Sequence, residues 1–309
     1  MKKLFAAIAA LGLAATVAFA QDYNAAVDAF NAGATALESN KTEALAQFRS
    51  ALSLAQALEG DEAAELVAKC KDAIPGVLMS IAKEKINEGA YDEALASLAE
   101  TQTVAAEYGV AAVADEATAL VPNVYLRKGS TLLKDKDFTG AAEALGKVVE
   151  LTPEDGQAFL LLGQAQMQNG NLPAATEALE KAAAFGKADQ ANKLLSNVFL
   201  KEGMSLVKAG KNAEAIEALE KSNSYVESAN AYKLIASAYT KSGKSKDAIN
   251  AYKKYLEVSP NAKDADDIIF TIAATAQKAG DKATATEYYK KLTGSAKYAA
   301  QAAAQLKTV

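Results

Sequence analysis

The sequence of 309 residues predicts an all-α protein built from stacked helical hairpins. A three-residue pattern indicates this fold: a Gly or Ala is followed by an Ala twelve residues later, and by a Leu, Phe or Tyr four residues after that. The pattern occurs seven times, and the composition is half hydrophobic with only five prolines. Repetition of one helix–turn–helix unit at a spacing of roughly 34 to 50 residues is typical of an α-solenoid.

The members of the pattern recur in register along the chain. The first small residues are Ala32, Ala82, Gly129, Gly163, Gly203, Ala236 and Ala273. The central alanines are Ala44, Ala94, Ala141, Ala175, Ala215, Ala248 and Ala285. The bulky residues are Phe48, Leu98, Leu145, Leu179, Leu219, Tyr252 and Tyr289. Small residues that face each other let two helix axes approach closely, and the bulky side chain one turn later fills the groove behind them.

A turn is predicted between the two small residues of each copy. This slot holds Gly89, Gly170, Gly210, Gly243 and Gly280, and we assign Ser39 and Asp135 to it in the other two copies. Glycine ends a helix readily because it adopts the left-handed conformation of a C-terminal cap. Each copy therefore predicts a helix, a turn and a second helix.

The first twenty residues are excluded from this fold. Lys2 and Lys3 precede the apolar stretch 4–17, and Ala18-Phe19-Ala20 has the small-x-small pattern of a signal peptidase site. This apolar stretch is shorter than the span of about 20 residues that crosses a bilayer. We expect cleavage after Ala20 and an exported protein, periplasmic or extracellular, that has no stable membrane span; the alternative is an uncleaved anchor.

The first two repeat intervals are unusually long. Successive central alanines are 50, 47, 34, 40, 33 and 37 residues apart. In the first interval a helix is expected to start at Gly60-Asp61 and to kink or restart at Pro75-Gly76. In the second, a stretch over residues 105–120 is expected to end before Pro122. We therefore predict irregular, longer hairpins over residues 21–121 and a regular array over 122–309. No Pro/Ser/Gly-rich linker divides this single solenoid, and residues 295–306 form its capping helix.

The composition excludes several classes of function. The chain has no histidine, so it contains no Ser-His-Asp triad, no His-ligated zinc site and no histidine general base. Its one cysteine, Cys70, shares a helical stripe with Leu66, Val67 and Ile74, which predicts a core residue, with a reactive thiol as the alternative. The formal net charge of −5 disfavours nucleic-acid binding. We expect no enzyme activity, no cofactor and no metal.

The best copies of the pattern resemble the tetratricopeptide repeat family. One contains Tyr125, Gly129, Leu132, Phe138, Ala141, Leu145 and Val148 and closes with Leu151-Thr152-Pro153. A second runs from Tyr232 to Pro260, and the resemblance covers residues 22 to 293. It implies a right-handed superhelix of about seven hairpins, whose first helices line a concave groove that binds peptides or proteins. Leu126, Leu160 and Leu200 occupy slots where some family members place residues that clamp a carboxylate, so that activity is not expected here.

A candidate groove follows from helical phase on the first helices. It comprises Asn123, Leu126, Ser130, Leu133, Gln157, Leu160, Gln164, Met167, Asn197, Leu200, Met204, Val207, Asn230 and Lys233. Amides can bind a peptide backbone, and Leu and Met can contact an amphipathic segment. The alternative is that these apolar residues pack between neighbouring helices.

These observations favour a non-catalytic interaction scaffold of the bacterial cell envelope that binds another protein or peptide through the candidate groove. One alternative is a structural protein that self-associates through the alanine-rich tail at 299–304. Another is a glycan or cell-wall hydrolase that uses carboxylates, for which the sequence offers no pair in an apolar pocket.

Overall fold

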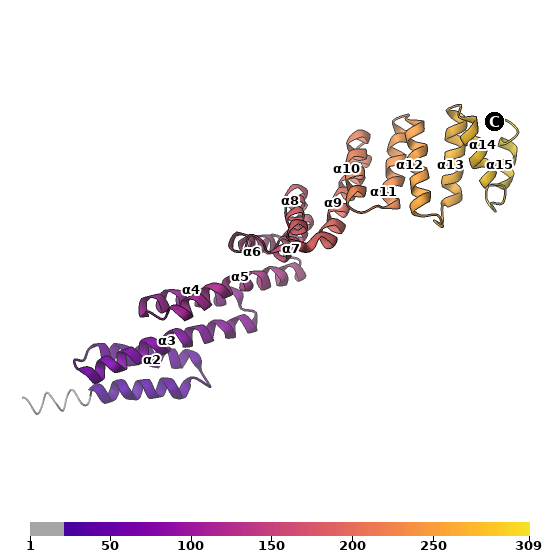
Figure 1. Ribbon diagram of the computed structural model, residues 1–309. Helices are drawn as coiled ribbons and strands as arrows, with labels where there is room; N and C mark the ends of the chain where they lie inside the picture. Colours follow the sequence, from indigo (N-terminus) through magenta and orange to yellow (C-terminus); the bar gives the residue numbers. More distant parts are fainter. Residues whose placement is uncertain (1–21) are drawn as a thin grey trace, which may run out of the picture. The chain divides into compact units, whose positions relative to one another are not determined.

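The computed structural model describes residues 22–309 of the chain (Figure 1). Within these residues the chain forms only helices and the turns between them, which confirms the predicted all-α class. The predicted signal segment, residues 1–20, lies outside the described residues. The chain divides into two compact units, one ending at Pro153 and the other beginning at Glu154. Each unit is described by itself.

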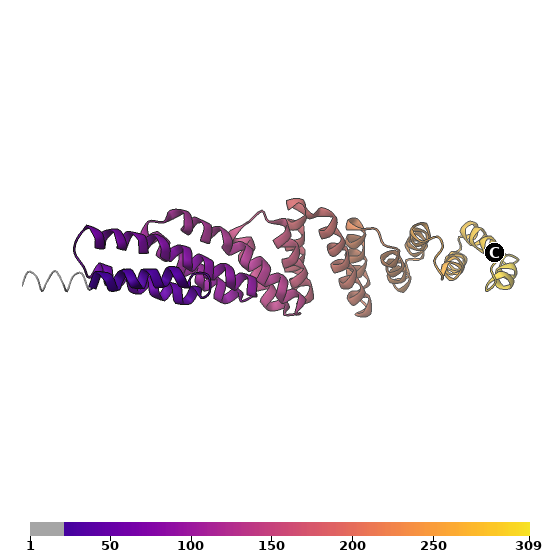
Figure 2. The same ribbon diagram turned by 90° about the horizontal axis from the view of Figure 1, so that it is seen from below.

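The first unit consists of three helical hairpins. Its helices are a segment over residues 22–36, α2 (Lys41–Gln56), α3 (Asp61–Glu88), α4 (Tyr91–Tyr108), α5 (Ala111–Lys134) and α6 (Phe138–Leu151). Consecutive helices from α2 to α6 pack against each other, and Figure 2 shows the helices of this unit, in indigo to magenta, lying lengthwise beside one another. Phe30 packs edge-on against Phe48 with 5.1 Å between ring centroids, which joins the 22–36 helix to α2.

The extra length of the first two intervals lies in longer helices. The predicted restart at Pro75-Gly76 is wrong, because α3 continues through Pro75 for 28 residues. Likewise α5 runs through Pro122. A proline inside a helix removes one backbone hydrogen bond and costs about 3 kcal/mol. In α3 this cost is offset by packing, since Ile74, Pro75 and Leu78 are all buried in the core of the first unit.

Two members of the repeat pattern differ from the prediction. Ala32 is exposed, and the buried small residue of the first hairpin is Gly33. A Cβ at Gly33 would lie 3.1 Å from the Phe48 ring and 3.2 Å from the Ala44 carbonyl oxygen. In the third hairpin the left-handed residue is Lys136, with φ 64°, and Asp135 stays in the right-handed region. Each difference is a shift of one residue along the chain.

The second unit contains four hairpins and a terminal helix. They pair α7 (Gly156–Gln168) with α8 (Leu172–Ala182), α9 (Ala188–Lys208) with α10 (Asn212–Tyr225), α11 (Ala229–Lys241) with α12 (Ser245–Val258), and α13 (Ala265–Lys278) with α14 (Lys282–Lys291). Gly170, Gly210, Gly243 and Gly280 all have φ near +75°, as predicted for C-terminal caps. The seven central alanines are all fully buried across the two units.

The predicted capping helix is present but short. It is α15 (Ala299–Gln305), and it packs against α14 (Figure 1). Its start is delayed because the Ser295 hydroxyl accepts hydrogen bonds from the backbone N–H groups of Lys297 and Tyr298, which holds residues 295–298 in a turn. The Tyr298 ring stacks on Phe270 with 4.6 Å between centroids, and Ala302 is fully buried. These contacts cover the end of the second unit.

Candidate functional site

The candidate groove residues of the first unit lie along one face of α5. Asn123 is exposed, and Leu126, Ser130 and Leu133 are half-buried. The separation of three or four residues keeps their side chains on one side of the helix. This row therefore offers one exposed amide beside half-buried apolar side chains.

The corresponding residues of the second unit differ in accessibility. Leu160 is only 4% exposed, so its side chain belongs to the core and not to a surface. Leu200 and Val207 are half-buried and pack against the cluster that includes Leu219 and Ile235. Gln157, Gln164 and Met167 are half-buried, whereas Asn197, Met204, Asn230 and Lys233 are exposed. The surface that remains for a partner is centred on α9 and the start of α11.

Lys233 is already engaged within the protein. Its ammonium lies 2.5 Å from an Asp264 carboxylate oxygen, and the Tyr255 hydroxyl donates to the other oxygen of Asp264. Lys233 and then Tyr255 lower the pKa of the Asp264 carboxyl. The hydrogen bond to Asp264, together with burial, raises the pKa of Tyr255 to about 12. An acidic partner at this point would compete with Asp264 for Lys233.

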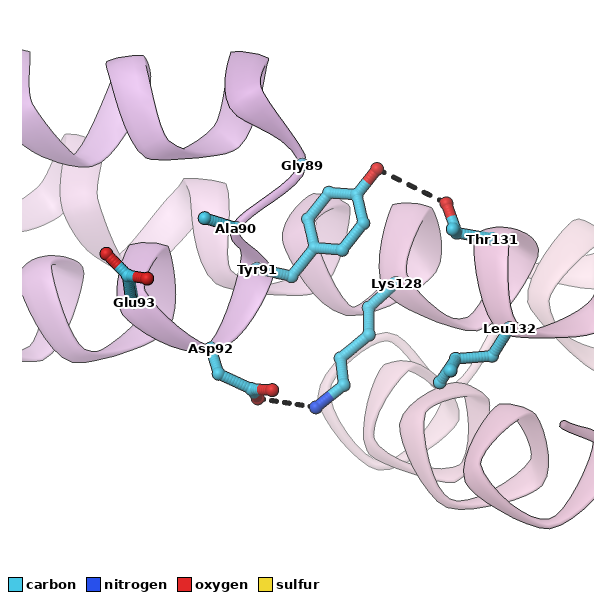
Figure 3. A pocket seen from close by; sticks show the side chains of 8 residues that line it. All are labelled: Gly89, Ala90, Tyr91, Asp92, Glu93, Lys128, Thr131 and Leu132. Atoms are coloured by element: carbon cyan, nitrogen blue, oxygen red, sulfur yellow. Dashed lines mark hydrogen bonds and ion pairs between the residues drawn. The ribbon is translucent and has the colours of Figure 1, made fainter. Parts of the chain in front are cut away.

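A cavity of about 320 Å³ lies beside the turn between α3 and α4 in the first unit (Figure 3). Gly89, with φ 79°, forms this turn and brings Tyr91 and Asp92 toward α5. The Lys128 ammonium lies 2.5 Å from an Asp92 oxygen, and the Tyr91 and Thr131 hydroxyls are 3.3 Å apart. Both contacts are drawn as dashed lines in Figure 3 and connect two neighbouring hairpins.

A second cavity, of about 460 Å³, shares Asp92, Lys128 and Leu132 with the first. It is further lined by Tyr125 of α5 and by Glu143 and Lys147 of α6. A cavity of about 230 Å³ in the second unit is built from the same repeat positions, with Tyr232, Ile235 and Tyr239 of α11 and Asp247, Asn250, Ala251 and Lys254 of α12. Tyr125 and Tyr232 each precede the small residue of their repeat by four residues. The repeat therefore places the same cavity in both units.

Sequence reasoning did not find these cavities, although one signal for them was available. A lysine follows the central alanine by six residues in five consecutive repeats, at Lys147, Lys181, Lys221, Lys254 and Lys291. These lysines contact aromatic rings or carboxylates rather than forming an isolated basic patch. The repeated lysine gave no prediction, because the repeat was defined only by the small and bulky residues at the interface between the two helices of a hairpin.

The described residues show no arrangement for metal binding or thiol chemistry. Within residues 22–309 no group of three or more Cys, Asp or Glu side chains is placed to hold a metal ion. Cys70 is buried, as predicted, and burial raises the pKa of its thiol to about 11. Because only the thiolate is nucleophilic and a raised pKa keeps the thiol protonated, Cys70 is unreactive at neutral pH. No helix in the same range is long and apolar enough to cross a membrane.

A family profile agrees with the repeat pattern. The profile described as tetratricopeptide repeat matches residues 126–192 and 200–265. No curated protein sequence matches the chain. Similar solved structures include a crystal structure of MamA protein, with a TM-score of 0.38, 23% identity and coverage of 59% of this chain and 96% of that chain. Another is MamA from Desulfovibrio magneticus RS-1, with a TM-score of 0.34, 18% identity and coverage of 56% and 93%. Residues 126–192 and 200–265 are thus identified as tetratricopeptide repeats.

Proposed function

We propose that the protein is a non-catalytic scaffold that binds another protein or a peptide through the exposed side chains of its first helices. The observation that carries this proposal is the profile match. Tetratricopeptide repeats are interaction modules, and the matched residues contain Met204 of α9 and all of α11, which includes Asn230 and Lys233. Asn197 and Met204 share one face of α9, because they are seven residues apart.

The chemistry of this face suits an amphipathic segment. Met204 is 38% exposed, which is high for an apolar side chain. Its flexible thioether can contact apolar side chains of different shapes. The Asn197 and Asn230 amides are exposed and can donate and accept hydrogen bonds at a peptide backbone. Leu160 takes no part, because it is buried.

The experiment compares two substitutions of equal exposure. Met204→Glu places a charge on the proposed face, whereas Val226→Glu places one at a residue 39% exposed outside the candidate groove. Crosslinked partners are isolated from envelope extract, and helicity is checked by circular dichroism. We expect Met204→Glu to lose partners that Val226→Glu retains. The same set of partners with both folded variants would contradict the binding face.

We further propose that the partner belongs to the cell envelope. This part rests on the sequence of residues 1–20, where two lysines, an apolar stretch and Ala18-Phe19-Ala20 form a secretory signal pattern. Mass spectrometry of the protein recovered from fractionated cells should find an N-terminus at Gln21 in the exported fraction. An intact Met1 in the cytosol alone would contradict export.

A further inference from the structure

Five central alanines are followed by a lysine six residues later, and four of these lysines, Lys147, Lys181, Lys221 and Lys254, adopt two arrangements. In the two repeats with phenylalanine on the first helix, the lysine lies over that ring. Lys181 Nζ is 5.4 Å from the Phe159 centroid, and Lys221 Nζ is 4.3 Å from the Phe199 centroid. Both distances are within the range of about 6 Å in which a cation is attracted to a ring face. Lys181 also pairs with Glu177, four residues before it, at 2.9 Å. In these repeats a lysine of the second helix therefore covers the phenylalanine ring of the first helix.

In the two repeats with tyrosine four residues before the small residue, the lysine pairs instead with the glutamate three residues after it. Lys147 Nζ lies 2.7 Å from Glu150, and Lys254 Nζ lies 2.6 Å from Glu257. The phenylalanine repeats have Ala184 and Ser224 at the position of these glutamates and cannot form this pair. The two tyrosines are also the ones that line the paired cavities. In both repeats where the lysine pairs with a glutamate three residues later, a cavity is open beside the tyrosine ring.

The two open cavities differ in whether they contain a cation of their own. In the first unit, Lys128 of α5 and Asp92 both line the cavity, and Figure 3 shows their ion pair from the side of the neighbouring cavity at Gly89. In the second unit the position of Lys128 is occupied by Ile235, which is 4% exposed. The position of Asp92 is occupied by Ala213, so the Lys128–Asp92 pair has no counterpart in the second unit. Glu220 and Asp247 line the cavity there, and neither carboxylate has an ion-pair partner within residues 22–309. No lysine of α11 is among the lining residues of this cavity.

The charges around this second-unit cavity have a negative balance. Besides Glu220 and Asp247, Glu227 accepts a hydrogen bond from the Tyr232 hydroxyl at 2.9 Å, and Glu257 pairs with Lys254. The cations are Lys254 and Lys244, whose Nζ lies 5.9 Å from the Tyr239 centroid. Glu220, Tyr239 and Asp247 line the same cavity, and burial together with these two carboxylates raises the pKa of Tyr239. Four carboxylates thus surround two tyrosine rings and two ammonium groups.

We propose that the cavity formed by Tyr232, Tyr239, Glu220 and Asp247 binds a cationic side chain, arginine or lysine, of a protein partner. The tyrosine faces attract a cation, and the two carboxylates accept its charge-assisted hydrogen bonds. The cavity volume of about 230 Å³ accommodates one such side chain. The site lies on a different face of α11 from Asn230 and Lys233, so it is a second contact surface, separate from the candidate groove.

The test uses a minimal probe and its uncharged counterpart. The purified chain, labelled with ¹³C at its tyrosine rings, is titrated with N-acetyl-arginine methylamide and with N-acetyl-citrulline methylamide. We expect saturable shifts of the Tyr232 and Tyr239 ring signals with arginine, and at least about tenfold weaker binding of citrulline, because citrulline lacks the charge. Equal shifts with both probes, or no saturable shift with arginine, would overturn the proposal.

Three variants test how the site is built. Combined Glu220→Gln and Asp247→Asn should abolish arginine binding, and binding that persists would overturn the assignment of these carboxylates. Glu257→Ala should also weaken binding, because it frees Lys254 to cover the Tyr232 ring as Lys221 covers Phe199. The matched control is Glu150→Ala in the sibling repeat, which should bind like the unaltered chain. Equal effects of Glu257→Ala and Glu150→Ala would overturn the role of Glu257.

Discussion

At the scale of single residues, the hairpins depend on how closely two helices can approach at one position. In four hairpins this position is a glycine, and in three of them a Cβ there would lie within 2.6 Å of a buried leucine: Gly129 against Leu145, Gly163 against Leu179 and Gly203 against Leu219. The small–Ala–bulky spacing was readable from the sequence for this reason. The shift from Ala32 to Gly33 was not, because it depends on where the first helix ends: this helix ends three residues after Gly33, whereas α7 ends five residues after Gly163.

The close approach of the helices at Gly203 predicts that replacing this glycine by alanine lowers stability, although alanine has the higher helix propensity. Gly203→Ala should destabilise the protein by about 1–2 kcal/mol, since overpacking against Leu219 outweighs the gain in helix propensity of about 1 kcal/mol. Gly146→Ala is the control, because it lies within α6 with no atom within 4 Å of its added Cβ, and it should stabilise. Urea unfolding of both variants measures this; the same sign for both would contradict the packing argument.

Lys136 predicts a stabilising substitution at a turn. It has φ 64° at the position where four repeats of the second unit have glycine. A non-glycine residue in this left-handed conformation is strained by about 1–2 kcal/mol, which glycine avoids. Glycine in turn loses more backbone entropy on folding, which offsets about 0.5–1 kcal/mol of that gain. Lys136→Gly should therefore raise the free energy of unfolding by about 0.5–1 kcal/mol. Gly170→Lys, the reverse change in another repeat, should lower it; a Lys136→Gly variant less stable than the parent would refute this reasoning.

Burial of Cys70 predicts slow reaction with thiol reagents. A pKa of about 11 instead of 9.0 leaves about one hundredth of the usual thiolate fraction near neutral pH. Native protein should therefore react with a disulfide reagent at least about a hundredfold more slowly than urea-unfolded protein. Rapid labelling of the folded chain would show that Cys70 is accessible.

At the scale of helices, tertiary packing decides where an element ends. Proline before a glycine predicted a break at Pro75-Gly76, yet α3 continues because Ile74, Pro75 and Leu78 are buried together. The glycine caps at Gly170, Gly210, Gly243 and Gly280 were predictable because their effect is local. The interruption by proline was not, since its outcome depends on neighbours that are distant in sequence.

The contact of α11 and α12 with Asp264 predicts a pH-dependent contribution to stability. Because Lys233 and Tyr255 lower the pKa of Asp264 in the folded state, its carboxylate stabilises the protein above pH 3.8. This contribution is lost as the pH falls from 3.8 through the lower folded-state pKa. Asp264→Asn should reduce the urea midpoint at neutral pH, and the difference from the parent should shrink as the pH falls below 3.8. A constant difference across this range would exclude the titration of Asp264 as its cause.

At the scale of the whole molecule, the repeat register was predictable and the binding surface was only partly so. The alanine positions specify seven hairpins because each is fully buried. Accessibility could not be predicted in the same way: Leu160 is buried whereas Met204, at an equivalent helical phase, is 38% exposed. The cavities escaped prediction because they depend on which carboxylate each lysine pairs with, as Glu257 and Lys254 show.

The central claim is that the exposed face of α9 contacts a protein partner. The most direct measurement places a photoreactive benzophenone amino acid at position 204 and, in a separate strain, at position 226, whose native side chains are 38% and 39% exposed. After illumination of living cells, the account predicts a discrete crosslinked protein from position 204 and none of that mass from position 226. Identical products from both positions, or none from position 204 in a folded and abundant protein, would contradict it.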